Sequence, residues 1–417
     1  MSEWREVAVE ALCSRVTSGG TPSRKRADYY TDEGIPWVKS QELIGARIAT
    51  TEEHISEAGL ERSSAKLLPP DTVLLAMYGA NVGQLGWLGI EATVNQAICA
   101  MVTDPREADA RFLYYALAGA RERLVGNAHG AAQQNLSQQL IKPFKLAVPA
   151  LATQRRIGAI LRSIDELIEN NRRRIEVLEK MARAIYREWF VKFRYPGHED
   201  VPMVDSALGL IPDGWEVQPL AAIATVNGSS RKPGGDEVFR YLDISALSER
   251  HIGELEAIGG SSAPGRARRV VSPGDTVWAT VRPNRRAHAL LVAPDSDWIA
   301  STGLAVLTPS TVSPDFLFET TSATAFSDWL VGRATGSAYP AVRAKDFEEA
   351  PIVVPDVAVD AAFADKVSPM HDLSWRLRNK CSRLAALRDL LLPKLVTGQI
   401  DISTLDLDAL VARQVAQ

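Results

Sequence analysis

Two long stretches of the chain, residues 154–195 and 359–398, place apolar residues at the spacing of an amphipathic helix. The a positions of a heptad repeat over the first stretch hold Ile157, Ile164, Asn171, Leu178 and Ile185. The same positions in the second hold Phe363, Met370, Leu377, Leu384 and Leu391. Each pattern therefore predicts a helix of about 40 residues, roughly 60 Å long at 1.5 Å per residue. We expect the two helices to pack as an antiparallel coiled coil with a globular domain at each end, the alternative being that each helix docks separately on its own domain.

Two details of these helices bear on their length and register. Asn171 is the one polar residue at an a position, a placement that fixes coiled-coil register at some cost in stability. Ser368-Pro369 lies near the start of the second helix. Because proline lacks a backbone N–H and clashes with the preceding turn, we expect this helix to begin late or to kink there.

The rest of the chain alternates short β-like runs with turns. The predicted strands are IPWV (35–38), TVLLAMY (72–78), QAICAMV (96–102), FKLAVP (144–149), VFRYLDI (238–244), DTVWATV (275–281), LAVLTP (304–309) and PIVVP (351–355). Short helical patches at 110–124 and 314–330 interrupt them. This order predicts α+β rather than alternating βαβ units. We expect domains at 1–153 and 213–358, a Pro- and Gly-containing linker at 196–212, and an acidic tail at 399–417.

The second half of the chain repeats the first. LVGNAHG (124–130) aligns with LVGRATG (330–336) at an offset of 206, and the same offset superposes the predicted strands that end at Pro149 and Pro355. It also superposes the apolar positions of the two long helices. Phe112-Leu113-Tyr114-Tyr115 matches Phe316-Leu317-Phe318-Glu319 with a shift of only two residues. The chain is therefore predicted to be a duplication of one unit, a mixed α/β domain followed by a long helix, related by a pseudo-twofold axis.

Charge and composition leave DNA binding open. The net charge is −4, whereas nucleic-acid binders usually carry a basic excess. Residues 154–194 nevertheless hold eleven Lys or Arg against six acids, either as a solvated helix face or as part of a binding surface. The three cysteines are far apart and form no disulfide or metal pattern. With no apolar run of membrane-spanning length and no signal-peptide pattern, we expect a cytoplasmic protein without membrane contact.

Motifs that carry catalysis are missing from the sequence. It contains no Walker A loop, no HExxH, no GxSxG elbow and no Asn/Asp-Pro-Pro-aromatic loop of an amino-methyltransferase. The spacing of Gly79, Gly83, Gly86 and Gly89 matches no dinucleotide fingerprint, and the six histidines show no ligand spacing. The sequence thus favours a binding protein without catalytic residues, metal or cofactor of its own.

Loops rich in base-reading residue types supply the candidate site. Arg reads guanine, Asn and Gln read adenine, and hydroxyls and backbone N–H groups position phosphates. The first domain offers three loops (19–26, 78–84 and 131–139) whose candidate residues are Gly19, Gly20, Thr21, Ser23, Arg24, Lys25, Arg26, Tyr78, Asn81, Gln84, Gln133, Gln134 and Asn135. The second offers loops at 229–235, 265–269, 282–286 and 333–343, with candidates Arg231, Lys232, Arg282, Asn284, Arg285, Arg286, Arg333, Ser337 and Tyr339. One scaffold carrying two different sets of loops should read two different half-sites.

An ordered set of motifs resembles one protein family. The first half carries GGTPSR (19–24), YY (29–30), GIPWVKS (34–40), KLLPPDTVL (66–74), YGANVG (78–83), NQAI (95–98) and FLYY (112–115). Three further segments complete the set: the helix at 154–193, GLIPDGWEV (209–217) and LRDLLLPKLVTGQI (387–400). Over almost its whole length the chain resembles the specificity subunits of type I restriction–modification systems.

The resemblance implies a mechanism. Each target-recognition domain would read one part of a split double-stranded DNA site, and the antiparallel helices would set the gap between the parts. The helices would also dock two modification subunits, which bind S-adenosylmethionine and methylate adenine, while restriction subunits would add ATP- and Mg²⁺-dependent translocation and cleavage. Two other classes stay open on the residues alone: a self-contained nuclease or methyltransferase with an unrecognised site, and a coiled-coil adaptor without DNA contacts.

Overall fold

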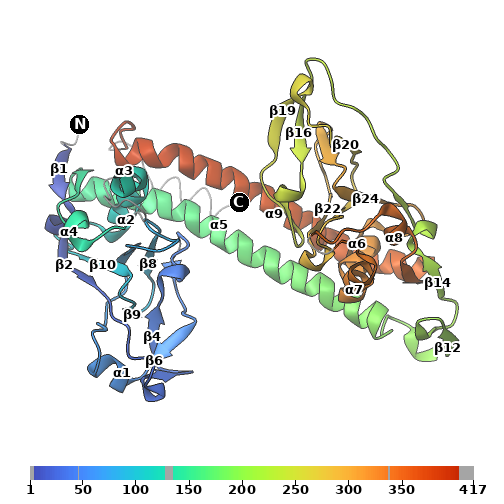
Figure 1. Cartoon of the computed structure of the whole chain (residues 1–417), viewed down its shortest axis with the longest axis horizontal. Coiled ribbons are helices and arrows are strands. Elements are labelled where there is room, and N and C mark those ends of the chain that lie inside the picture. The colour runs from blue at the N-terminus through green and yellow to red at the C-terminus, as the bar shows by residue number, and fades with distance from the viewer. Residues whose placement is uncertain (1–3, 46, 127–134, 337–338, 403–417) are drawn as a thin grey trace. The chain divides into compact units, whose positions relative to one another are not determined.

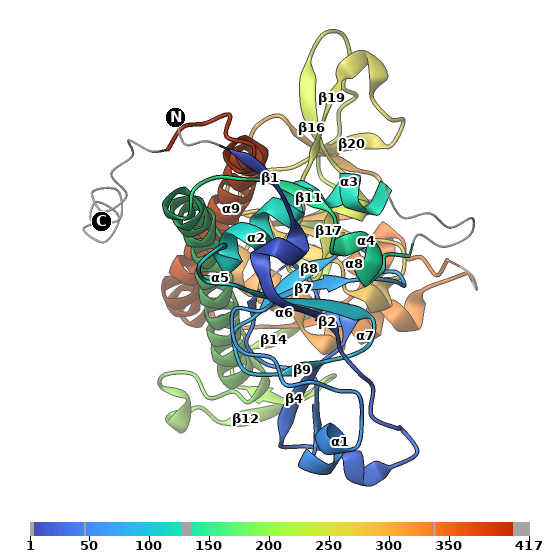
Figure 2. The same cartoon turned by 90° about the vertical axis from the view of Figure 1, so that its left-hand side faces the viewer.

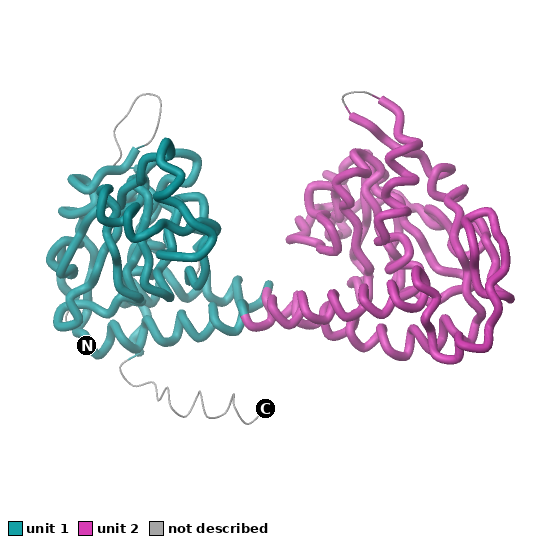
Figure 3. The backbone as a smooth tube through the Cα atoms, turned by 90° about the horizontal axis from the view of Figure 1, so that it is seen from below, with its two compact units in different colours: residues 1–169, 382–417 teal, residues 170–381 magenta. Residues whose placement is uncertain are grey.

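The computed structural model describes residues 4–45, 47–126, 135–336 and 339–402. The chain forms two compact units, drawn in different colours in Figure 3. Unit 1 comprises residues 1–169 and 382–417, and unit 2 comprises residues 170–381. Each long helix contributes its two ends to different units, so each unit holds one globular domain and a segment of both helices.

Unit 1 is built on two sheets. The larger has the order β2-β10-β7-β8-β5, formed by Cys13–Ser18, Ile98–Thr103, Val73–Ala76, Leu85–Leu88 and Arg47–Ile48. The smaller has the order β3-β6-β4-β9, formed by Tyr30–Thr31, Glu53–Ile55, Ile35–Val38 and Thr93–Val94. A two-stranded ribbon joins β1 (Arg5–Ala8) to β11 (Lys145–Val148). The helices of the domain are α1 (Glu57–Glu61), α2 (Ala110–Gly119), α3 (Arg121–Gly126) and α4 (Gln138–Ile141).

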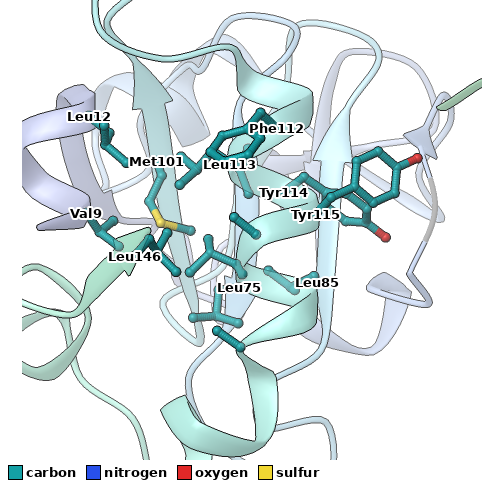
Figure 4. Packing of buried hydrophobic residues seen from close by; sticks show 14 of the residues in the cluster. Val9, Leu12, Leu75, Leu85, Met101, Phe112, Leu113, Tyr114, Tyr115 and Leu146 are labelled. Atoms are coloured by element: carbon teal, nitrogen blue, oxygen red, sulfur yellow. The ribbon is translucent and has the colours of Figure 1, made fainter. Parts of the chain in front are cut away.

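The central strands of unit 1 have unbroken apolar sequences because both faces of their sheet are covered. Val73 and Leu75 of β7 point into the core under α2, where Phe112 is fully buried (Figure 4). Leu74 and Ala76 point into a second core on the opposite face. Successive side chains of a strand face opposite sides, so a strand covered on both sides needs apolar residues at every position.

Unit 2 repeats this plan. Its first sheet has the order β15-β24-β21-β22, formed by Ala224–Val226, Leu304–Pro309, Thr276–Ala279 and His288–Leu290. Its second has the order β19-β16-β23-β20, formed by Glu256–Gly259, Val238–Leu242, Trp298–Ser301 and Ala267–Val270. The ribbon is β14 (Glu216–Pro219) with β25 (Pro351–Val354), and the helices are α6 (Pro314–Ser322), α7 (Thr324–Arg333) and α8 (Ala344–Glu348). Two further hairpins pair β12 (Met203–Ser206) with β13 (Gly209–Pro212) and β17 (Leu247–Ser248) with β18 (His251–Ile252).

The predicted duplication is confirmed in the topology of the sheets. Both domains place the strand after the ribbon at the edge of the first sheet, beside β10 or β24. Both hold one parallel pair in the second sheet, β4 with β9 and β16 with β23. Both ribbons join the first strand of the domain to the strand that leads into the long helix. The α+β class and the internal repeat were therefore correctly predicted.

The long helices are α5 (Leu151–Tyr186), which continues as a π-helical turn over Arg187–Val191, and α9 (Val357–Val396). They run side by side (Figures 1 and 2). In unit 1, Asp165 of α5 pairs with Arg388 of α9 at 2.9 Å, and Ile157 shares a core with Leu395. In unit 2, Glu179 pairs with Arg378, and the rings of Phe190 and Phe363 lie 4.9 Å apart. Rising numbers on α5 meet falling numbers on α9 in each unit, so the predicted antiparallel pairing is confirmed.

Of the two outcomes expected at Ser368-Pro369, a late beginning of the second helix or a kink, the late beginning is wrong. Helix α9 begins at Val357 and continues through Ser368-Pro369. The turns before the proline are held by burial, because Phe363 and Val367 are completely inaccessible to solvent. This packing offsets the cost of about 3 kcal/mol that a proline imposes inside a helix.

Candidate nucleic-acid interface

The structure brings the candidate loops of the first domain together at the end of the sheet. The backbone N–H of Leu136 donates to the carbonyl of Met77 at 2.6 Å, which joins the third loop to the β7–β8 hairpin. Tyr78 donates its hydroxyl to the carbonyl of Gln96 at 2.8 Å. Thr21 of the first loop hydrogen-bonds to the side chain of the same glutamine. The three loops therefore form one surface, although Gln133 and Gln134 lie outside the described residues.

Gln96 is a candidate that sequence reasoning missed. Its side chain is exposed, and it lies between Thr21 and Tyr78, two of the predicted residues. Glutamine can present a donor and an acceptor to adenine, so this position suits base reading. The signal was available in NQAI (95–98), an amide pair directly before a buried strand.

Several other predicted residues of this domain are engaged within the protein. Arg24 pairs with Glu53 at 2.6 Å and places its guanidinium 4.3 Å from the ring centre of Tyr30. Its hydrogen bond holds the pKa of the Glu53 carboxyl below the usual range. Arg26 pairs with Asp28 at 2.7 Å. Ser23, Lys25 and Asn135 are exposed.

Two glycines, one side-chain amide and one backbone carbonyl of the same loops serve the fold. A Cβ on Gly19 would lie 1.8 Å from the carbonyl oxygen of Val94, and one on Gly20 would meet the backbone at Ala65 at 2.4 Å. These glycines are buried, so the close approach they permit is to the protein's own backbone. Asn81 donates its side-chain amide to the carbonyl of Ser40 at 3.2 Å. The backbone carbonyl of Gln84 accepts from Ala76 at 2.8 Å, closing the hairpin.

The second domain pairs the equivalent loops in the same way. The N–H of Val342 donates to the carbonyl of Thr280 at 2.9 Å, the counterpart of the contact between Leu136 and Met77. Arg282 donates its backbone N–H to Pro340 at 2.7 Å. Its guanidinium lies 4.8 Å from the ring centre of Tyr339, whose side chain is 69% exposed. The hairpin loop and the segment at 339–343 thus form one surface, and Ser337 lies outside the described residues.

The remaining arginines of this domain divide into exposed and structural ones. Asn284 and Arg285 are exposed at the tip of the hairpin. Arg286, in contrast, donates to the carbonyl of Ser322 at 2.6 Å and pairs with Glu249 at 3.2 Å. Arg282 and Arg286 have φ values of +55° and +54°, a left-handed conformation that costs free energy in a residue with a Cβ. The loop holds its arginines in a fixed, strained shape.

Two further predicted sites are partly engaged. Arg231 pairs with Glu237 at 2.8 Å, and its backbone N–H donates to Arg268, so this loop lies along β20. Lys232 beside it is exposed. Arg333 pairs with Glu349 at 3.0 Å and lies over the ring of Trp329.

Part of the basic run at 154–194 is paired with acids of the same helical segment. Arg162, Lys180 and Lys192 each pair with a glutamate one helical turn away. Such exposed i,i+4 pairs contribute about 0.3–0.5 kcal/mol each. These pairs neutralise three of the eleven basic residues of the run.

Two cysteines and one histidine, residue types that often carry chemistry, are buried or half-buried in the protein. Burial raises the pKa of the Cys13 and Cys99 thiols to about 12. Burial also lowers the pKa of His288 to about 3, and its ring stacks on Trp278 at 4.5 Å. Within the described ranges, no group of three His, Cys, Asp or Glu side chains could hold a metal ion. No helix in those ranges is long and apolar enough to cross a membrane.

Known proteins resemble the chain in sequence and in fold. A family model described as the type I restriction modification DNA specificity domain matches residues 1–180. The chain is 24% identical over 402 residues to the type I restriction enzyme MjaIX specificity subunit of Methanocaldococcus jannaschii, covering 94% of this chain and 92% of that protein. It is 21% identical over 421 residues to the EcoBI specificity subunit of Escherichia coli, covering 95% and 86%.

A solved structure has the same fold over nearly the whole chain. The crystal structure of the type I restriction–modification S subunit from M. genitalium matches with a TM-score of 0.64 at 17% identity, covering 94% of this chain and 96% of that chain. The matched sequences and the duplicated fold agree with the motifs found along the sequence. The chain belongs to the specificity subunits of type I restriction–modification systems.

Proposed function

We propose that this specificity subunit reads a bipartite, asymmetric site in double-stranded DNA, one half with each globular domain. The observation that carries the proposal is the repeated loop pairing, Leu136 with Met77 and Val342 with Thr280. The same backbone contact in both domains presents a hairpin loop beside a second loop. A scaffold that repeats while its loop side chains differ is suited to reading two different sequences.

The exposed side chains differ in kind between the two surfaces. The first presents hydroxyls and an amide from Thr21, Tyr78 and Gln96. The second presents Asn284 and Arg285 at the hairpin tip. Both surfaces present an amide, which pairs best with adenine, and the second adds Arg285, which pairs best with guanine, so the two half-sites should differ in base composition.

The helices supply the spacer and the attachment points for partners. Met181 of α5 and Leu387 of α9 are equivalent at the offset of 206, and both are exposed, by 46% and 44%. Exposed apolar side chains at equivalent positions of the two repeats support docking of two copies of one partner, one on each repeat. We infer that these partners are two methyltransferase subunits that bring S-adenosylmethionine. Restriction subunits would join through this complex with ATP and Mg²⁺, so methyl transfer and cleavage belong to the partners.

Methylome sequencing tests the proposal. The chain should be expressed with its partner subunits in a host without other adenine methylation. We expect one split motif with a fixed gap, and Arg285→Ala should relax one half of it while the other half stays unchanged. A methylated motif that is continuous, or that responds in both halves to this substitution, would contradict the proposal. For the partners, Met181→Glu with Leu387→Glu should abolish co-purification of the methyltransferase, and each single variant should retain one copy.

A further inference from the structure

Each recognition domain is fixed to its long helix by a buried polar contact at the start of that helix, here called the cap joint. In unit 1, Gln154 of α5 accepts from the backbone N–H of Asp109 at 3.1 Å. In unit 2, Asp360 of α9 accepts from the backbone N–H and the hydroxyl of Ser313 at 2.7 and 2.6 Å. Asp109 and Ser313 are the N-caps of α2 and α6. The same position of each domain therefore contacts the same position of its helix.

A second contact, here called the mid-helix joint, lies further along each helix. In unit 1, Tyr115 donates its hydroxyl to Asp165 at 2.6 Å, and Asp165 also accepts from Arg388 of the other helix at 2.9 Å. In unit 2, His371 contacts Glu319 at 2.9 Å through one ring nitrogen and Asp315 at 2.5 Å through the other.

The mid-helix joint of unit 2 also reaches the other long helix. Glu319 accepts two hydrogen bonds from Arg250, at 3.1 and 2.6 Å. Arg250 in turn lies 4.0 Å from Glu179 of α5. In both units, this joint therefore ties the domain to its own helix and to the antiparallel one.

The positions of the joints are equivalent, and their chemistry is not. The helix residues correspond at the offset of 206, Gln154 with Asp360 and Asp165 with His371. The domain residues correspond at an offset of 204, two fewer than for the long helices. This is the offset at which Phe112 of α2 matches Phe316 of α6, and at which Tyr115 matches Glu319. An amide has been exchanged for a carboxylate and a phenol–carboxylate pair for a carboxylate–imidazole pair. What the two repeats share is the placement of the contacts.

Two joints restrain a domain more than one can. They are eleven residues apart on each long helix, about 17 Å at 1.5 Å per residue. On the domain helices they are six residues apart, about 9 Å. Apolar burial has no preferred direction, whereas a buried hydrogen bond is lost when its partners rotate apart. A domain that swivelled on its helix would part the buried ring of His371 from both of its carboxylates, and the buried side-chain oxygen of Gln154 from its donor.

We propose that Tyr115 with Asp165, and Glu319 with His371, are positioning residues that hold each recognition domain at one angle on its helices and so restrict the complex to one DNA spacer length. This inference rests on the proposed function, because it takes each domain to read one half-site. The joints do not touch DNA. They act by fixing where the base-reading loops point.

Methylome sequencing of joint variants in the complete complex tests the inference. Tyr115→Phe removes one hydroxyl and keeps the ring, and His371→Gln keeps one donor for one carboxylate. The matched controls are Tyr114→Phe and His288→Gln, since Tyr114 bonds to Gly45 and His288 to Arg286, both within their own domains. The readout is the methylation of native half-sites separated by the wild-type spacer and by one base pair more or fewer.

We expect the joint variants to raise methylation at the altered spacers relative to the wild-type spacer by about tenfold, with unchanged half-sites and unchanged controls. The double variant should raise it further. Unchanged spacer selectivity in Tyr115→Phe, or an equal loss of methylation at every spacer, would overturn the inference, since a merely structural role would lower methylation uniformly. Tyr115→Phe decides the matter even if His371→Gln fails to accumulate. The absence of any split motif in the wild type would instead overturn the proposed function.

Discussion

The imidazole of His371 should stabilise unit 2 in a way that depends on pH. Its side chain is 6% exposed, with carboxylates of Asp315 and Glu319 at its two ring nitrogens. An ionised carboxylate only accepts hydrogen bonds, so both nitrogens must donate and the ring carries a positive charge. Removing one partner of a buried ion pair costs about 3–5 kcal/mol. We expect about 3 kcal/mol for His371→Gln, because Glu319 keeps Arg250, Asp315 keeps Ser368 and the amide replaces one donor.

The sign of the pH dependence follows from the pKa of His371. Burial alone would lower this pKa, but the hydrogen bonds to Asp315 and Glu319 outweigh it and raise the pKa above the usual 6.5. A group whose folded pKa is raised contributes stability that is fully present below its unfolded pKa and is lost as the pH rises through the folded value. Burial raises the pKa of Glu319, but Arg250 and His371 lower it to about 2, so this carboxylate stays ionised from pH 6 to 9. The free energy of unfolding that unit 2 loses in His371→Gln should therefore be larger at pH 6 than at pH 9.

Hydrogen exchange measures this loss locally, which matters because a chain of two units need not unfold in one step. The amides of α6 should exchange faster in His371→Gln than in the wild type, after correction for the intrinsic pH dependence of exchange. The control, His288→Gln, alters a ring whose pKa is about 3 and which stays neutral throughout the range. An effect of His371→Gln that is equal at both pH values, or larger at pH 9, would refute the assignment of a charged imidazole.

Four further predictions concern the core, two loop residues and one thiol. Phe112→Ala should cost unit 1 about 3–5 kcal/mol, seen as a lower denaturant midpoint for exchange of its sheet, because the ring is completely buried. Gln96→Ala should lower the selectivity for one base of the methylated motif by about 1–3 kcal/mol. An unchanged motif in methylome sequencing would show that Gln96 does not read a base. Arg286→Ala should instead lower thermal stability, since its guanidinium bonds to the carbonyl of Ser322. Cys99 should resist alkylation at pH 8 in the native chain, and rapid labelling would contradict its raised thiol pKa of about 12.

Local periodicity made the elements of this fold predictable. The heptads of α5 and α9 and the apolar runs of β7 and β10 are regular over many residues, so they identify both the elements and the repeat. A late beginning of α9 was considered because the rule for Pro369 is local, whereas the burial of Phe363 that holds the preceding turn is tertiary. A long-range contact of this kind leaves no signature in the spacing of residues.

The candidate site was only partly predictable for the same reason. Sequence reasoning found the loops, because Gly, Arg and amide residues mark them. It could not separate an arginine free to meet DNA from one bound within the protein. Arg24 is neutralised by Glu53, which is 29 residues away, and Arg286 is held by Ser322, 36 residues away. Such pairings depend on which strands become neighbours, and the residue types alone do not report it.

The two repeats differ at the reading loops and share the placement of the joints. If stability alone governed the joints, apolar pairs would serve as well, because replacing a buried ion pair by packed hydrophobic residues is often neutral or stabilising. The polar contacts nevertheless occur at equivalent positions in both units, in two different chemistries. Directional contacts are needed where an angle matters and a small slip is harmful. A subunit that must present two reading surfaces at a fixed spacing along DNA has that requirement, and the joints are where this chain meets it.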